Sequence, residues 1–333
     1  MSSLTTRGGQ LAIAVAAVLV LVIGLAAAGA FDGCRKATTN TGRPSAAVTG
    51  APHGGVAYAT AKVLAHDISP RRVADTWGEI KAREFIMGAL QQYGYFPLTA
   101  EFISGSGAGR VHSANVIAVK EGESAKRLIV GAHYDSVAVG EGYSDNATGI
   151  GLLLETAARV KRQTTPYTVV FVAFGAEENG SLGAKEYLRS LPTVERRATI
   201  GMIDLDAPAG GDAVSVASRF GGATWLRDDA LTAAKALGIP LQTSPAAPGR
   251  PAGVTLAPSD DVPFADEDFA TAVFSAVAWE RSRGRRVAAT AGFPWFDAGR
   301  VVVTSPLDGW HLEAGEHVKL GVALAAEVRR LLA

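Results

Sequence analysis

Continuous apolar runs separated by helical patterns constrain the fold of this chain most strongly. Residues 128–132 (LIVGA) and 168–174 (TVVFVAF) contain no charged residue, which is typical of strands buried on both faces. Further strands are predicted at 115–119, 199–205 and 271–277, and apolar residues at helical spacing predict helices at 79–93, 147–160, 180–189, 224–237 and 316–332. This alternation predicts an α/β fold of three layers, α/β/α, in which helices cover both faces of a mixed, mostly parallel central sheet.

The first 55 residues differ in character from the rest of the chain. Segment 11–31 contains no charged residue, and a helix of about 20 apolar residues is long enough to cross the hydrocarbon layer of a bilayer. Arg7 precedes it, which favours a cytoplasmic position for residues 1–10. Segment 32–55 is rich in Thr, Gly, Pro, Ser and Ala and is interpreted as a flexible linker. Residues 56–333 are then predicted to form one domain outside the cytoplasm.

Two other interpretations of segment 11–31 stay open. Ala28-Gly29-Ala30 has the small-residue pattern of a signal-peptidase site, and cleavage there would give a secreted protein. A lipid attached to Cys34 is disfavoured because the acidic Asp32 lies where a small neutral residue is expected. We favour a single-pass anchor in the cell membrane, because the apolar run is long for a signal peptide.

Composition limits the partners and the chemistry. The formal net charge is zero at pH 7, without the basic excess expected of a chain that binds nucleic acid. Cys34 is the only cysteine, which excludes an internal disulfide and a metal site built from several thiolates. Any metal must therefore be held by His, Asp and Glu. The sequence does not indicate an oligomeric state.

Histidine and acidic residues follow the predicted buried strands. In an open α/β sheet, ligands bind outside the carboxyl ends of the strands, so side chains from different strands are expected to meet there. Asp145 precedes a predicted helix, and His311 lies near the C-terminus. The candidates are, in chain order, His133, Asp135, Asp145, Glu177, Glu178, Asp204, Asp206 and His311.

Each candidate also has an ordinary structural explanation. Asp145 before a helix is typical of an N-cap, and two adjacent glutamates at a helix start interact favourably with the helix dipole. These explanations do not account for acids gathered beside two histidines, where unpaired carboxylates repel one another. Histidine and carboxylates without a thiol suit zinc, and a carboxylate that bridges two ions holds them about 3.5–4 Å apart.

The motifs resemble those of the zinc-dependent aminopeptidases, a family typified by bacterial leucyl aminopeptidases, aminopeptidase Y and the alkaline phosphatase isozyme-conversion aminopeptidase. The resemblance rests on the order and spacing of GAHYDS at 131–136, SDNATG at 144–149, GAEENGSLGAKEYL at 175–188 and MIDLD at 202–206. It covers roughly 56–333. The resemblance implies the phosphorylase/hydrolase-like zinc exopeptidase architecture and two zinc ions per chain. It also implies removal of N-terminal residues from peptides with a free amino terminus.

The resemblance further implies a role for each candidate. The metal ligands would be His133, Asp145, Glu178, Asp206 and His311, of which Asp145 would bridge the two ions. Glu177 would be the general base. Asp135 and Asp260 would support the ligands without binding metal, and the Asp135 carboxylate is expected to accept the second imidazole N–H of His133.

Two assignments carry alternatives. Asp204 and Asp206 lie on the same side of a strand, and the resemblance favours Asp206 because relatives commonly have Asn at the position of Asp204. His317 is the alternative to His311, although it falls inside the predicted closing helix. Relatives also often have His at the position of Asp261, so a contact that supports the site is in doubt.

Two other functions stay open beside the two-zinc aminopeptidase. A glutaminyl cyclase-like transferase would use a similar acidic cluster with one zinc ion. A membrane-anchored binding module on a peptidase scaffold would keep the ligands without the activity. Metal stoichiometry and hydrolysis of aminoacyl amides distinguish the three functions.

Overall fold

The computed structural model describes residues 54–71, 76–137, 141–208, 213–236, 241–244, 246 and 249–277. The predicted anchor or signal segment at 11–31, residues 32–53 of the predicted linker and the predicted helix at 316–332 lie outside these residues. Within the described ranges, no helix combines the length and apolar character that crossing a bilayer requires.

Nine strands of the described residues form a central sheet, in the order β1-β2-β4-β3-β5-β9-β6-β7 with β8 paired to β6. The strands are β1 (Leu98–Ser104), β2 (Val111–Lys120), β3 (Ser124–His133), β4 (Tyr167–Phe174), β5 (Thr199–Leu205), β6 (Ala213–Arg219), β7 (Leu241–Gln242), β8 (Val254–Thr255) and β9 (Ala270–Val277). Strands β4, β3, β5 and β9 run parallel to one another, whereas the pairs β1–β2, β2–β4 and β6–β9 are antiparallel. The predicted mixed, mostly parallel sheet is confirmed.

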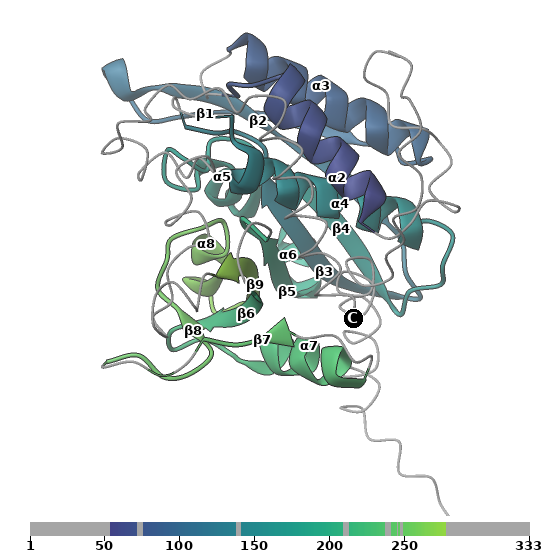
Figure 1. Ribbon diagram of the computed structural model, residues 1–333, viewed down its shortest axis with the longest axis vertical. Helices are drawn as coiled ribbons and strands as arrows, with labels where there is room; N and C mark the ends of the chain where they lie inside the picture. Colours follow the sequence, from purple (N-terminus) through teal and green to yellow (C-terminus); the bar gives the residue numbers. More distant parts are fainter. Residues whose placement is uncertain are drawn as a thin grey trace, which may run out of the picture.

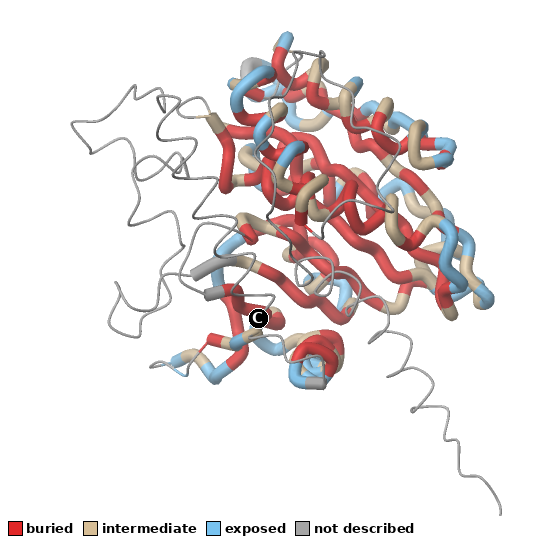
Figure 2. Tube along the Cα trace, turned by 45° about the vertical axis from the view of Figure 1, so that its right-hand side comes forward, coloured by how far each residue is buried: buried red, intermediate tan, exposed pale blue. Residues whose placement is uncertain are grey.

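Helices cover both faces of this sheet (Figure 1). They are α2 (Gly55–Lys62), α3 (Trp77–Gln92), α4 (Thr148–Val160), α5 (Leu182–Ser190), α6 (Thr193–Ala198), α7 (Trp225–Ala236) and α8 (Val262–Ala265). Leu128 and Val130 of β3 pack on one face with α2, α3, α4 and α7. Ile129, which lies between them, packs on the other face with α5 and α8. Successive residues of β3 are therefore buried on opposite faces, and Figure 2 shows the buried strands between partly exposed helices. The predicted three-layer fold is confirmed.

The sequence did not predict helices α2, α6 and α8 or strands β1, β6, β7 and β8. Strand β1 is an edge strand with mostly exposed side chains, so it lacks the apolar pattern of a buried strand. Helix α2 buries small residues, and it lies so close to α4 that a Cβ on Gly151 would be 2.3 Å from the carbonyl oxygen of Ala57. Its first residue, Gly55, is the last residue of the predicted linker.

Glu155 attaches the start of α2 to α4. Its side chain is fully buried, and its two oxygens accept hydrogen bonds from the main-chain N–H groups of Gly54 and Ala57, both at 2.8 Å. Arg159 donates to the same carboxylate at 2.9 Å. Because the first N–H groups of a helix have no partner within the helix, this carboxylate satisfies donors that would otherwise be buried without an acceptor.

We expect Glu155→Gln to lower the free energy of unfolding by about 1–3 kcal/mol, because the amide nitrogen would face a buried N–H donor. Urea unfolding followed by circular dichroism measures the loss. The matched control is Glu84→Gln on α3, where the glutamate is exposed and pairs with Lys81, and its expected change is below about 0.5 kcal/mol. Equal stability of the two variants would contradict this role for Glu155.

Candidate metal centre

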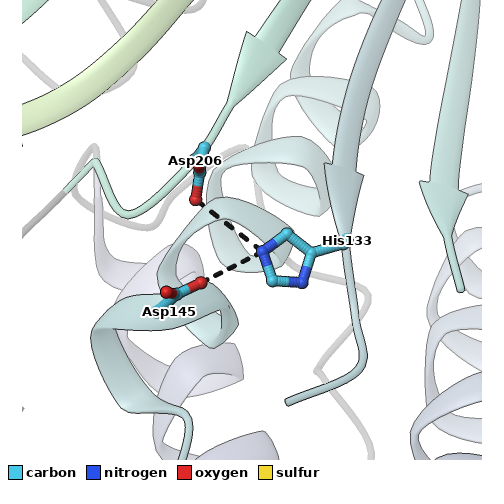
Figure 3. A group of neighbouring side chains, drawn as sticks. All are labelled: His133, Asp145 and Asp206. Atoms are coloured by element: carbon cyan, nitrogen blue, oxygen red, sulfur yellow. Dashed lines mark ion pairs between the residues drawn. The ribbon is translucent and has the colours of Figure 1, made fainter. Parts of the chain in front are cut away.

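Three side chains from separate segments meet at the carboxyl end of the parallel strands. His133 is the last residue of β3, Asp145 lies in the turn η4 (Tyr143–Ala147) before α4, and Asp206 directly follows β5. Nε2 of His133 lies 3.0 Å from Oδ1 of Asp145 and 3.7 Å from Oδ1 of Asp206. Figure 3 shows both carboxylates directed at this ring nitrogen. One ligand atom from each residue lies within 4.8 Å of the other two, and the described part of the chain contains this one group of potential metal ligands.

Asp206, and not Asp204, is the acid of this strand that approaches His133. The Asp204 carboxylate is buried and accepts hydrogen bonds from Oγ of Ser259 at 2.7 Å and from the main-chain N–H of Asp261 at 3.2 Å. Asp206 lies one residue beyond β5, and its own N–H still donates to Phe274 of β9 at 3.0 Å. Leaving the sheet at this point brings the Asp206 carboxylate beside the end of β3.

Asp135 links His133 to the loop that carries Glu177 and Glu178. Its Oδ1 accepts the main-chain N–H of Glu177 at 3.0 Å, and its Oδ2 accepts that of Glu178 at 3.1 Å. Nδ1 of His133 lies 3.2 Å from the main-chain oxygen of Asp135 and 3.5 Å from its Oδ1. The carboxylate therefore mainly orients the glutamate loop, and the closest contact of Nδ1 is with the main-chain oxygen of Asp135 rather than with the expected carboxylate.

Glu177 and Glu178 follow β4 through a tight turn in which Ala176 has a φ of 60°. Oγ of Ser181 lies 3.5 Å from Oε1 of Glu177. Burial raises the pKa of Glu177 to about 9 and that of Glu178 to about 7, and the carboxylate of Asp145 reinforces both shifts. The Glu178 carboxylate does not belong to the group of three ligand atoms described above. Glu178 therefore lies next to the three ligands in the fold: its pKa responds to Asp145, and its main-chain N–H is bonded to Asp135.

The charges of the centre favour a cation at its middle. Although burial lowers the pKa of the His133 imidazole, its contacts with Asp135, Asp145 and Asp206 raise this pKa well above its usual value. The acids thus stabilise a positive charge here. One imidazole nitrogen and two carboxylate oxygens, with no thiol, form a donor set that suits zinc. Because Nδ1 is held by Asp135, Nε2 faces the acids as a metal ligand requires.

Asp260 and Asp261 belong to the segment that contacts Asp204, and their carboxylates have different surroundings. Both are fully buried. Among the described residues, neither carboxylate oxygen of Asp260 has a hydrogen-bond partner, and burial raises its pKa well above the usual value. Asp261, where relatives often have His, forms an ion pair with Arg219 and accepts a bond from Oγ1 of Thr271 at 3.3 Å. The contact expected of a histidine is thus replaced by a buried acid–arginine pair.

Arg71 is a residue of this region that the sequence did not indicate. Its side chain is fully buried, and its guanidinium donates hydrogen bonds to four main-chain oxygens. These oxygens belong to Leu64 at 2.7 Å, Tyr134 at 2.9 Å, Glu141 at 3.0 Å and Gly142 at 2.6 Å. Arg71 therefore joins the segment after His133 to the segment before Asp145. No sequence motif predicts that an arginine will join these two segments, because these acceptors are main-chain carbonyl groups, which every residue has.

His311, the last predicted ligand, and its alternative His317 lie outside the described residues. The structure thus brings together His133, Asp145 and Asp206. It puts Asp135, Glu177 and Glu178 next to them through the hydrogen bonds of Asp135.

Known proteins share both the sequence pattern and the fold. The sequence profile of peptidase family M28 matches residues 115–311, which is more than half of the chain. The alkaline phosphatase isozyme conversion protein of Escherichia coli is 31% identical over 203 residues, which cover 53% of this chain and 59% of that protein. This chain therefore spans less than two thirds of the length of that relative.

Two solved structures illustrate the fold. A zinc aminopeptidase from Bacillus subtilis superimposes with a TM-score of 0.60 at 16% identity, covering 82% of this chain and 93% of that one. A glutaminyl cyclase from Tannerella forsythia superimposes with a TM-score of 0.59 at 16% identity, covering 87% and 99%. At these identities the superpositions show a shared fold. The profile match, which includes the segments of His133, Asp145 and Asp206, shows that the chain belongs to peptidase family M28.

Proposed function

We propose that this protein is an exported zinc aminopeptidase that hydrolyses the N-terminal peptide bond of peptides with a free amino terminus. The observation that carries this proposal is the convergence of His133, Asp145 and Asp206 around one point, beside a loop that presents Glu177. Membership of peptidase family M28 supports peptide hydrolysis as the reaction. The uncharged segment 11–31 supports export, with membrane attachment or cleavage as the two outcomes.

The proposed centre would hold two zinc ions. His133 and Asp206 would bind one ion, Glu178 and His311 would bind the other, and Asp145 would bridge them. Zinc ions in such a centre polarise the carbonyl group of the substrate and lower the pKa of bound water. Glu178 follows Glu177 directly, so the loop that supplies a ligand also supplies the proposed base.

Glu177 would move the proton. It would accept a proton from the attacking water and deliver it to the amine that leaves, so that no covalent intermediate is needed. The main-chain N–H of Glu177 is held by Asp135, and Ser181 lies beside its carboxylate, which limits where the carboxylate can lie. Burial makes the Glu177 carboxylate a stronger base than an exposed one, and cations bound beside it would lower its pKa from this raised value toward neutral pH.

Chromogenic aminoacyl amides test this proposal on the purified full-length chain in detergent. We expect hydrolysis that a chelator abolishes and that zinc restores, with a plateau at two zinc ions per chain. An N-acetylated amide of the same amino acid is the matched control and should resist hydrolysis. Activity that survives complete removal of metal would contradict the proposal, and zinc binding without hydrolysis would favour a binding module.

A second candidate is a glutaminyl cyclase that uses one zinc ion. The similarity to the Tannerella forsythia structure, which extends over 99% of that chain, favours keeping it. Peptides with an N-terminal glutamine distinguish the two reactions. A cyclase converts them to products that have lost ammonia, whereas an aminopeptidase releases free glutamine. Mass spectrometry of the products decides between them.

A further inference from the structure

Asn146 lies between two of the proposed zinc ligands and contacts both of their segments. It follows Asp145 in the chain, and its side chain is fully buried. Its Nδ2 donates a hydrogen bond to the main-chain oxygen of Leu205 at 2.7 Å. Its Oδ1 accepts the main-chain N–H of Ala207 at 3.1 Å. Leu205 and Ala207 are the residues immediately before and after Asp206, so one carboxamide brackets that ligand on both sides.

Helix capping alone does not explain Asn146. Its Oδ1 also accepts the N–H of Gly149 in the first turn of α4 at 3.0 Å, which is the usual bond of a residue at a helix start. The two bonds to the end of β5 add nothing to the helix. They connect segments separated by about 60 positions in the chain, as the separations of 59 and 61 residues show. An N-cap serine or aspartate lacks the N–H donor that faces Leu205.

The backbone on the β5 side of this contact has an unusual conformation. Ala207 has a φ of 46°, in the left-handed region that residues other than glycine seldom adopt. Such a conformation persists only where surrounding contacts hold it, and the bond from the Ala207 N–H to Asn146 is such a contact.

Gly149 packs closely against Asn146 and the end of β5. A Cβ on Gly149 would lie 2.2 Å from Oδ1 of Asn146 and 2.3 Å from the main-chain oxygen of Leu205. Position 149 therefore requires glycine, because any side chain would separate the turn from β5. The contact of Asn146 and Gly149 with the end of β5 therefore fixes the distance between the segment of Asp145 and that of Asp206.

We propose that Asn146 is a positioning residue that sets the separation of the Asp145 and Asp206 carboxylates around His133. This inference rests on the proposed zinc centre. Both carboxylates approach the same nitrogen of His133, at 3.0 Å and 3.7 Å, and a shift of either segment would change the space between them. Asn146 touches no metal itself and acts through the two main-chain segments that it joins.

Zinc affinity measured by competition with a chromogenic chelator tests the inference without depending on activity. We expect Asn146→Ala to weaken zinc binding by about 10- to 100-fold, as the loss of groups that orient metal ligands commonly does. The visible spectrum of the cobalt-substituted variant should shift, because the ligand geometry changes. The matched control is Tyr95→Phe, which removes a buried bond of 2.8 Å to the oxygen of Ala157, also on α4. It should lose stability and keep wild-type zinc affinity.

Asn146→Asp decides the question if the alanine variant does not fold. It has the same size and keeps an oxygen for Ala207 and Gly149, but it replaces the donor that faces Leu205. Its added negative charge by itself would strengthen zinc binding, so weaker binding isolates the loss of geometry. Unchanged or stronger zinc binding by the folded variants, with wild-type protein that binds zinc, would overturn this inference alone. Wild-type protein that binds no zinc would overturn the proposed function and this inference with it.

Discussion

Glu177→Gln is expected to lower kcat for aminoacyl amide hydrolysis by about 10²- to 10⁴-fold, the usual contribution of a positioned general base. Glutamine keeps the size of the side chain but cannot accept the proton of the attacking water. The main-chain bond from residue 177 to Asp135 does not involve the side chain, so the loop should keep its place. Steady-state kinetics with zinc-saturated protein measures the loss, and zinc content measured on the same sample should equal that of the wild type.

The control for this variant comes from the helix that follows the loop. Glu186 on α5 forms its ion pair with Arg189 at 2.6 Å, away from the proposed centre. Glu186→Gln removes the same charge from a nearby glutamate and should leave kcat and zinc content unchanged. Near-normal kcat in Glu177→Gln would show that another group takes the proton. A parallel loss of zinc would show that Glu177 is a ligand and not the base.

Asp206→Ala is expected to weaken zinc binding by more than about 100-fold, because removal of groups that merely orient ligands already costs 10- to 100-fold. The physical reason is the loss of one of the acids that converge on His133. Chelator competition measures the affinity. Hydrolysis at limiting zinc should fall with it, and excess zinc should restore only part of the rate.

Asp204→Asn is the matched variant on the same strand. Asn retains an oxygen that accepts the bonds from Ser259 and Asp261, and the other oxygen of Asp204 has no partner among the described residues. We therefore expect wild-type zinc affinity. Comparison of the two variants distinguishes the roles of two acids that are two positions apart and have the same charge. If Asp204→Asn lost zinc and Asp206→Ala kept it, the ligand assignment on this strand would be reversed.

The local sequence pattern was sufficient to predict the central strands of the sheet. Residues 128–132 and 168–174 contain no charged residue, and every one of them is buried, as expected of a strand covered on both faces. The same reasoning located His133 at the end of β3 and the two glutamates after β4. Strands β1 and β6 were not predicted. An edge strand with exposed side chains and a strand with interspersed serines lack such an apolar pattern.

Candidate ligands were also named from the sequence, because His, Asp and Glu are the side chains able to bind zinc in a chain with one cysteine. The choice between Asp204 and Asp206 needed the three-dimensional structure. Both acids fit the motif, and they differ only in what the neighbouring segments offer them. Ser259 and the N–H of Asp261 occupy the Asp204 carboxylate, and the end of β3 lies beside Asp206.

The sequence by itself determined the layered α/β fold, the strand ends at which chemistry is expected and the residue types that meet there. Only the tertiary structure decided that Arg71 joins the segments around His133 and Asp145, that Asn146 brackets Asp206, and that Asp261 pairs with Arg219. The reason is physical. Periodicity along the chain records which face of an element is buried. In contrast, a hydrogen bond to a distant carbonyl group depends on which segments become neighbours, and carbonyl groups are the same in every residue.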